Sequence, residues 1–229
     1  MSAPSPLHGR RPYRSPSRDA AARLTRQRII DAAEDLFLDS GYVSTSVRSI
    51  ARAAGVAEKT VYLQFDTKPA ILKAVIRTAI GGSDDAVRIA RSQWFLEVLA
   101  QPRLDRKIEL LAEATSALHE RTGLVFAVAR EAATVDTEVE ALWKRGKRGQ
   151  LCDMTTIAEN FAEYGLIPPP VEVDWVIELL YVLLGPENWY LIRHELGHDE
   201  HHYRDWLHTT LDQALAPKQP TQRHPFVAR

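Results

Sequence analysis

The sequence holds a single cysteine, Cys152, among its 229 residues, so no disulfide can form within the chain. Long hydrophobic runs are also missing: no stretch approaches the roughly 20 apolar residues of a membrane helix, and no apolar run typical of a signal peptide begins the sequence. A glycine-rich phosphate loop is lacking too, which argues against nucleotide-dependent enzymes. These absences predict a cytoplasmic protein with no membrane partner and no cofactor.

Charge is distributed unevenly, although the formal net charge is only −1. Residues 1–80 carry 13 Lys and Arg against 7 Asp and Glu, whereas residues 81–229 carry 16 against 23. Within residues 1–28, seven Arg and one Asp lie among Pro, Ser and Gly, a composition typical of a disordered basic arm. The basic N-terminal third indicates an anionic partner for that part of the chain. For the arm alone, a solvated tail is an equally good interpretation.

Apolar residues recur at helical spacing along the chain, and no segment alternates as a strand does. The spacing predicts short helices over about 29–41, 47–54, 58–65 and 67–80, with Gly41 and the Gly81-Gly82 pair as stop signals. Longer helices follow, with breaks expected near Gln101-Pro102, Gly123, Gly165, Gly185-Pro186 and Gly197. The predicted fold is all-α, with an arm at 1–21, a small domain at 22–82, a larger domain at 83–216 and a flexible tail at 217–229.

The stretch from Ser46 to Phe65, SVRSIARAAGVAEKTVYLQF, has the pattern of a helix-turn-helix. Ala51 is small where the two helices would cross, and Gly55 can adopt the left-handed conformation that the turn requires. The apolar seam would be formed by Ile50, Ala54, Val56 and Val61. Such a unit places its second helix in the major groove of DNA, where polar side chains meet phosphates and base edges. A plain helical hairpin would leave the basic charge and the polar tips unexplained.

Residues from about Ala22 to Arg77 resemble the tetracycline-repressor (TetR) family of transcriptional regulators through the segments IIDAAEDLFLDSGY, TSVRSIARAAGV and TVYLQFDTKPAIL. The resemblance implies a homodimer with a three-helix DNA-binding domain, whose helix-turn-helix covers 45–64, followed by a helical ligand-binding and dimerisation domain. It also implies a palindromic double-stranded operator and a repressor that an unidentified small-molecule effector releases. Carried over by position, the DNA contacts fall on Thr45, Ser46, Arg48, Lys59, Thr60, Tyr62, Gln64 and Lys68. Phosphate contacts are expected from Thr45, Ser46 and Lys68.

Three positions depart from the family's pattern: Ala57 replaces a frequent Ser, Lys59 a frequent Gly and Gln64 a frequent His. The operator sequence can therefore not be carried over from a relative. Tyr62 is interpreted equally well as a phosphate contact or as a buried brace of the hairpin. Packing is the expected role of the three residues Val61, Leu63 and Phe65, although Leu63 could instead meet a thymine methyl group.

A zinc-dependent hydrolase is the main alternative, because HELGH at residues 194–198 matches the HExxH pattern. On one continuous helix the two histidines share a face and can share a zinc ion, with the Glu as base. The resemblance instead makes Gly197 a helix stop, which leaves His198 outside the helix, and no Glu follows Glu200 as a third ligand. We therefore expect no catalytic residue and no metal site. Adventitious metal binding by His194, His198, His201 and His202 stays open, as does an all-α protein-binding module.

The expected effector pocket lies between helices of the C-terminal domain and is built from aromatic side chains with a few polar groups. The candidates are Trp94, Phe95, His119, Phe126, Arg130, Trp143, Tyr181, Asn188 and Trp189. For each residue alone, packing in the core is the more frequent explanation. The KRGKRG run at 144–149 is interpreted as a solvated helix face. Helices from Val173 to Leu184 and from about Glu200 to Leu215 are expected to form a symmetric four-helix dimer interface.

Overall fold

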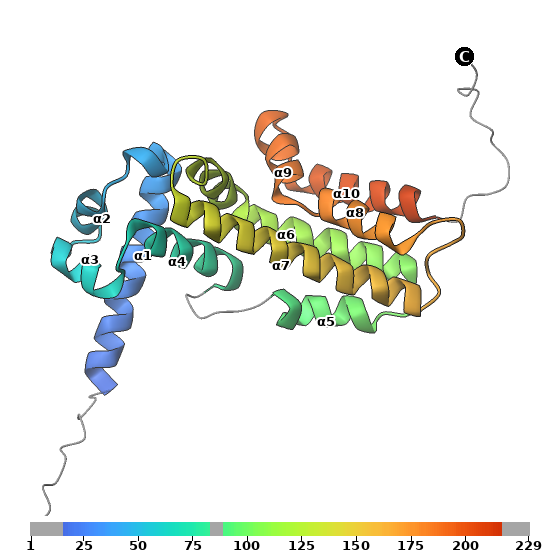
Figure 1. Ribbon diagram of the computed structural model, residues 1–229, viewed down its shortest axis with the longest axis horizontal. Coiled ribbons are helices and arrows are strands. Elements are labelled where there is room, and N and C mark those ends of the chain that lie inside the picture. Colours follow the sequence, from blue (N-terminus) through green and yellow to red (C-terminus); the bar gives the residue numbers. More distant parts are fainter. Residues whose placement is uncertain (1–15, 83–88, 217–229) are drawn as a thin grey trace, which may run out of the picture.

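The computed structural model describes residues 16–82 and 89–216, and every regular element in these two ranges is helical. The N-terminal unit consists of α1 (Pro16–Ser44), α2 (Val47–Ala53), α3 (Glu58–Gln64) and α4 (Lys68–Gly81). The C-terminal unit consists of η1 (Ile89–Arg91), α5 (Gln93–Ala100), α6 (Leu104–Ala132), α7 (Thr137–Glu163), α8 (Val173–Leu183), α9 (Pro186–Trp189), η2 (Tyr190–Glu195) and α10 (Glu200–Leu215). Figure 1 shows an elongated molecule with α2 and α3 at one end. The predicted all-α fold is confirmed.

The helix ends of the N-terminal unit follow local sequence signals. Gly41, at φ 75°, interrupts α1 where the stop was predicted, and Gly82, at φ 73°, ends α4 in the left-handed conformation that glycine tolerates. The side chains of Ser46 and Thr67 accept backbone N–H bonds at the starts of α2 and α4. One boundary was wrong: α1 already begins at Pro16, inside the predicted arm. Residues 1–15 of that arm and the tail at 217–229 lie outside the described residues.

Two apolar cores hold the helices together, and α6 belongs to both. The first core joins α1, α2, α3 and α4, but it also contains Val125 and Ala129 of α6 and Val139 of α7. The second lies among α5, α6, α7, α8 and α10, with Phe161 and Tyr203 among its fully buried side chains. The Gly81-Gly82 pair therefore separates two chain segments, while the core of the small unit continues into the large one.

Gly123 does not break a helix, contrary to the prediction, because α6 runs without interruption through it. A Cβ atom at this position would lie 2.1 Å from Cε3 of Trp189, so the missing side chain makes room for the indole ring. The glycine thus sets a close approach between α6 and α9. No helix in the described ranges is both long and apolar enough to cross a membrane.

Candidate nucleic-acid interface and ligand pocket

The α2–α3 hairpin is built as the sequence predicts. Ile50 and Val61 are fully buried, Ala51 is 3% exposed where the helices cross, and Gly55 takes φ 65° in the turn. Ser46 forms a reciprocal capping box with Ser49 at the start of α2. Short helices such as these two depend on packing for their stability, so the buried seam fixes the direction of α3.

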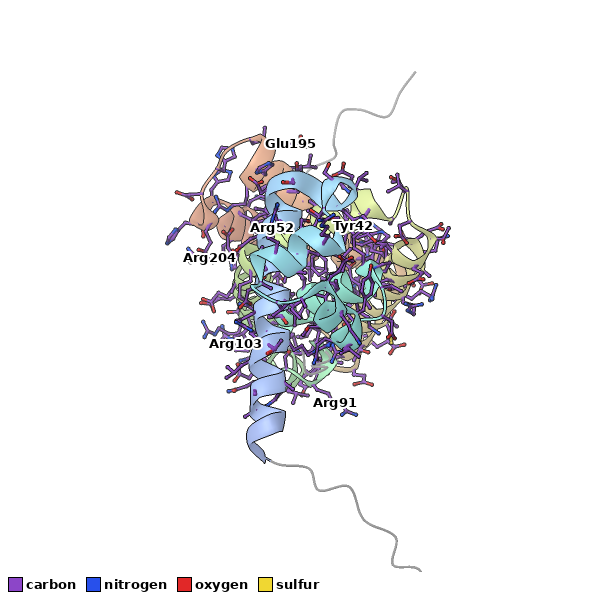
Figure 2. All side chains as sticks on the ribbon, turned by 90° about the vertical axis from the view of Figure 1, so that its left-hand side faces the viewer. Tyr42, Arg52, Arg91, Arg103, Glu195 and Arg204 are labelled. Carbon is purple, nitrogen blue, oxygen red and sulfur yellow. The ribbon has the colours of Figure 1, made fainter. Side chains whose placement is uncertain are left out.

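The outer faces of α2 and α3 carry most of the predicted DNA-contacting residues. Arg48, Lys59 and Ser46 are exposed, and Thr60 and Gln64 are half-buried. Tyr62 is 48% exposed, which contradicts the interpretation as a buried brace. Figure 2 looks onto this end of the molecule, with Arg52 of α2 labelled. Polar and basic groups thus gather on the surface that the hairpin presents to solvent.

Leu63 does not pack in the interior, contrary to our first expectation. Its side chain is 75% exposed, whereas Val61 and Phe65 are buried at 0% and 4% exposure. Val61 lies on the inner face of α3 and Phe65 directly follows the helix, while Leu63, two residues after Val61, points away. The helix geometry therefore places a large apolar side chain among the polar groups of the outer face.

Sequence reasoning missed Arg26 of α1, which supports the C-terminal end of α3. Its guanidinium donates to the backbone carbonyl of Gln64 at 2.6 Å and lies 3.9 Å from the ring centre of Phe65. A cation at a helix C-terminus is favourable because the last carbonyls are partly negative. Arg26 was hidden among the seven arginines of residues 1–28, and only its place on α1 sets it apart.

Two residues predicted to contact phosphate make hydrogen bonds within the protein. Thr45 is only 3% exposed, and its hydroxyl donates to the carbonyls of Leu36 and Gly41 beside the α1 break. The Lys68 ammonium donates to the carbonyls of Tyr42 and Thr45 at 2.9 and 3.0 Å and lies 4.0 Å from the Tyr42 ring centre. Both side chains therefore bind carbonyl groups near the end of α1, and their contact with phosphate stays a prediction.

A polar network connects this corner to the C-terminal unit. The Tyr42 hydroxyl donates to Asp136 at 2.7 Å, and Asp136 caps α7 by accepting from the backbone amides of Glu138 and Val139. Burial and the bond to Asp136 raise the pKa of Tyr42, while burial lowers the pKa of Lys68 against the opposing charge of Asp136. Thr67 at the start of α4 also donates to Glu138. The end of α1 and the starts of α4 and α7 are therefore joined by hydrogen bonds.

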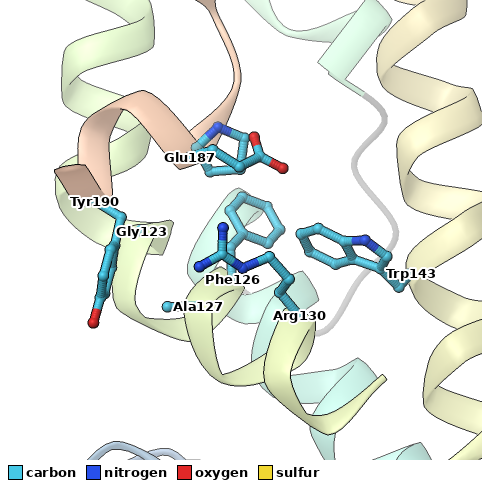
Figure 3. A pocket seen from close by; sticks show the side chains of 8 residues that line it. Gly123, Phe126, Ala127, Arg130, Trp143, Glu187 and Tyr190 are labelled. Atoms are coloured by element: carbon cyan, nitrogen blue, oxygen red, sulfur yellow. The ribbon is translucent and has the colours of Figure 1, made fainter. Parts of the chain in front are cut away.

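A narrow pocket lies between α6, α7 and the α9–η2 segment. Its wall contains three of the predicted effector residues, Phe126, Arg130 and Trp143, together with Gly123, Ala127, Pro186, Glu187 and Tyr190. Figure 3 shows the aromatic rings and the guanidinium around it. The ring centres of Phe126 and Trp143 are 6.4 Å apart in an edge-on arrangement. The enclosed volume of about 10 Å³ is close to the least that holds one water molecule.

Charge in this pocket is unbalanced. Glu187 forms an ion pair with Lys147 of α7 at 3.1 Å, so its charge is compensated. Arg130 has no ion pair with any residue of the described ranges, and its guanidinium lies 5.9 Å from the Tyr190 ring centre. The pocket thus offers aromatic surfaces and one uncompensated positive charge.

The other effector candidates lie outside this pocket. Phe95 is buried in the second core with Trp94 at its edge, and His119 is buried with a ring nitrogen 2.9 Å from the Tyr203 hydroxyl. Tyr181 stacks against the Lys147 ammonium, and the Asn188 amide donates to a backbone carbonyl of α8. The Trp189 indole faces Gly123 and donates to Glu120 at 2.7 Å. Burial, with Lys147 nearby, lowers the pKa of His119 to about 3, so this histidine is neutral at physiological pH.

Comparison with known proteins agrees with the geometry of the hairpin. The model for bacterial regulatory proteins of the tetR family matches residues 29–75, from the middle of α1 into α4. Residues 29–75 therefore match the DNA-binding segment of the TetR family. Among curated relatives, the HTH-type transcriptional regulator TtgW of Pseudomonas putida is 46% identical over 57 residues, 25% of this chain and 42% of that protein. UidR of Escherichia coli is 34% identical over 55 residues, 24% of this chain and 28% of that protein.

Solved structures match more than four fifths of this chain. A regulator from Syntrophomonas wolfei gives a TM-score of 0.69 at 16% identity, covering 86% of this chain and 98% of that one. FadR from Bacillus subtilis in complex with stearoyl-CoA gives 0.64 at 20% identity, covering 84% and 99%. The SmeT–triclosan complex gives 0.66 at 17% identity, covering 88% and 99%. At these low identities, the TM-scores show that the chains share a fold.

The HELGH stretch does not form the helix that a shared zinc ion would require. Gly197 takes φ 72°, as predicted, and His198 lies between η2 and α10. The His198 ring stacks on His202 at 3.8 Å, while His194 packs beside Tyr190. Within residues 16–82 and 89–216, no three His, Cys, Asp or Glu side chains are grouped closely enough to hold a metal ion. The geometry therefore gives no support to the hydrolase alternative.

Proposed function

We propose that this protein is a sequence-specific, dimeric DNA-binding repressor of the TetR family without enzymatic activity, which a small-molecule effector releases from a palindromic operator. The observation that carries the proposal is the α2–α3 hairpin: its inner face is packed and its outer face presents Arg48, Lys59 and Tyr62 to solvent. A major groove accepts a helix, and exposed cations beside polar tips are what phosphates and base edges require. In the proposed complex, α3 enters the groove and α2 crosses the backbone.

The proposed dimer forms through α8 and α10. On α8, Trp175 and Val182 are 43% and 61% exposed, and they lie seven residues apart on one face. Large apolar groups aligned in this way favour a helix-to-helix contact, and two-fold pairing of α8 and α10 would bury them in a four-helix interface. A two-fold dimer then requires a palindromic operator whose half-sites match the spacing of the two α3 helices.

The proposed effector site is the pocket of Phe126, Arg130, Trp143 and Tyr190. FadR of Bacillus subtilis was solved with stearoyl-CoA and SmeT with triclosan, so chains of this fold accept molecules with large apolar parts. Here the uncompensated Arg130 favours an effector with an acidic group beside its apolar body. Because the enclosed space is about 10 Å³, such a molecule must displace side chains to enter. Displacement along α6 would reach the polar network at Tyr42 and Asp136 and shift the DNA-binding unit.

The DNA-binding proposal is tested with two matched arginine variants. Arg48→Ala removes an exposed cation from α2, and Arg148→Ala removes one from the exposed face of α7. Fluorescence anisotropy with a random-sequence duplex is measured over a series of salt concentrations. We expect Arg48→Ala to weaken binding and to reduce the slope of log K against log salt by about 1, while Arg148→Ala leaves both unchanged. Equal effects of the two variants, or no binding by the wild type, would contradict the assigned surface.

A further inference from the structure

The helix proposed to enter the major groove, α3, carries an exposed leucine, Leu63, whose position is explained neither by phosphate contacts nor by packing of the fold. Leu63 is 75% exposed, the largest exposed fraction among the large apolar side chains of the described residues. It makes no contribution to the core of the hairpin, because Val61 on the inner face of α3 and Phe65 directly after the helix occupy that core. An isolated exposed leucine is ordinary on a protein surface, so its position on the helix is what matters.

Leu63 lies in the last turn of α3, on the outer face that would meet the bases. Residues three and four positions apart are neighbours on a helix, which places Leu63 beside Thr60 and Lys59 on the outer face. Both neighbours are polar, and Lys59 is exposed to solvent. The C-terminal end of α3 is held by the Arg26 hydrogen bond to the Gln64 carbonyl, so the outer face keeps one orientation. An apolar group is therefore presented at a fixed place between hydrogen-bonding groups.

The edges of base pairs in the major groove offer one methyl group. Adenine, guanine and cytosine present hydrogen-bond donors and acceptors there without a methyl group, whereas thymine also presents its C5-methyl group. A leucine pressed against a donor or acceptor would leave that group without its water, which costs affinity. Against a thymine methyl group the same leucine removes two apolar surfaces from water.

Resting on the proposed DNA-binding function, we propose that Leu63 is a specificity-determining residue that selects a thymine in each operator half-site by contact with its 5-methyl group. Lys59, Thr60 and Gln64 supply the polar contacts around it. This contact would give the exposed Leu63 side chain an apolar partner in the DNA complex.

The experiment removes single methyl groups from the DNA. After the preferred operator is obtained by selection from a random duplex pool, each thymine is replaced in turn by deoxyuridine, which lacks only the methyl group. We expect one symmetry-related thymine pair at which wild-type affinity falls about fourfold for one half-site and about 15-fold for both, from the transfer free energy of a buried methyl group. Binding by Leu63→Ala is expected to be weaker and insensitive to deoxyuridine at that pair.

The control is Leu196→Ala, which truncates a leucine that is 67% exposed in the C-terminal unit. It should retain the wild-type response to every methyl group, and thermal denaturation should find both variants as stable as the wild type, because exposed positions tolerate truncation. If wild type and Leu63→Ala respond equally at every thymine, or if the operator has no thymine whose methyl group matters, the Leu63 assignment is overturned and the regulator stands. If selection yields no operator at all, the regulator and this assignment fall together.

Discussion

Gly123 provides a sharp test of how the pocket is constructed. In Gly123→Ala, the new Cβ would lie 2.1, 2.3 and 2.5 Å from Cε3, Cζ3 and Cδ2 of Trp189. Ordinary contact begins near 3.4 Å, so the ring must move by about 1.3 Å. The indole is 5% exposed and is bonded to Glu120, which Arg193 also holds at 2.6 and 2.8 Å. The ring therefore cannot move without disturbing a charged hydrogen-bonded group.

The change in the free energy of unfolding is the sum of two destabilising contributions and one stabilising contribution. Overpacking a core position costs about 1–3 kcal/mol, and weakening a hydrogen bond to a charged group costs up to about 1.5–3 kcal/mol. Alanine in place of glycine inside a helix returns about 1 kcal/mol. We expect Gly123→Ala to lower the free energy of unfolding by about 2–4 kcal/mol and Tm by roughly 5–15 °C at equal protein concentration.

The matched control is Gly146→Ala, inside α7, where a Cβ atom would meet nothing within 4 Å. The same substitution should stabilise the protein there by about 0.5–1 kcal/mol. In a Trp189→Leu background the smaller side chain relieves the clash, and Gly123→Ala should lose most of its cost. Urea and thermal unfolding are measured for the wild type, for the three single variants and for the Gly123→Ala/Trp189→Leu double variant. Equal stability of the Gly123→Ala and Gly146→Ala proteins would refute the close-packing explanation.

Three further predictions concern the polar contacts and the dimer. Tyr42→Phe removes the bond to Asp136 and should cost about 1–2 kcal/mol in urea unfolding, whereas Tyr164→Phe, at a 43% exposed ring, should cost nothing measurable. The hydrogen bond from Arg193 lowers the pKa of Glu120 below its ordinary value of 4.5. The charged carboxylate therefore stabilises the fold above pH 4.5, and this stabilisation is lost as pH falls through the lower folded-state pKa. In urea unfolding over a pH series, Glu120→Gln should lose less stability than the wild type on acidification. Trp175→Glu should convert the proposed dimer to monomer in sedimentation, and a dimer unchanged by the substitution would exclude α8 from the interface.

The sequence predicted the parts of this fold that depend on neighbouring residues. Helix starts at Ser46 and Thr67 and the breaks at Gly41 and Gly197 are local events, in which a cap or a left-handed glycine acts within one turn. Gly123 was misread as a break because a glycine in a helix has the same local signature, and only the distant Trp189 explains it.

The candidate site divides along the same line. The exposure of Arg48 and Lys59 follows from helix periodicity, whereas the internal roles of Thr45 and Lys68 depend on carbonyl groups that only the folded α1 end brings near. The sequence suggested nine aromatic and polar residues as effector candidates, and three of them line the pocket. Periodicity identifies which side chains face inward, but it cannot separate a packed core from a cavity wall; helix crossings in three dimensions decide that.

The measurement that tests the central claim most directly is selection of bound duplexes from a random DNA pool by the purified full-length protein at near-physiological salt. The account predicts enrichment of one palindromic sequence, bound by a dimer, with half-sites an integral number of helical turns apart. A folded, dimeric protein that enriches no sequence, or one without dyad symmetry, would contradict it.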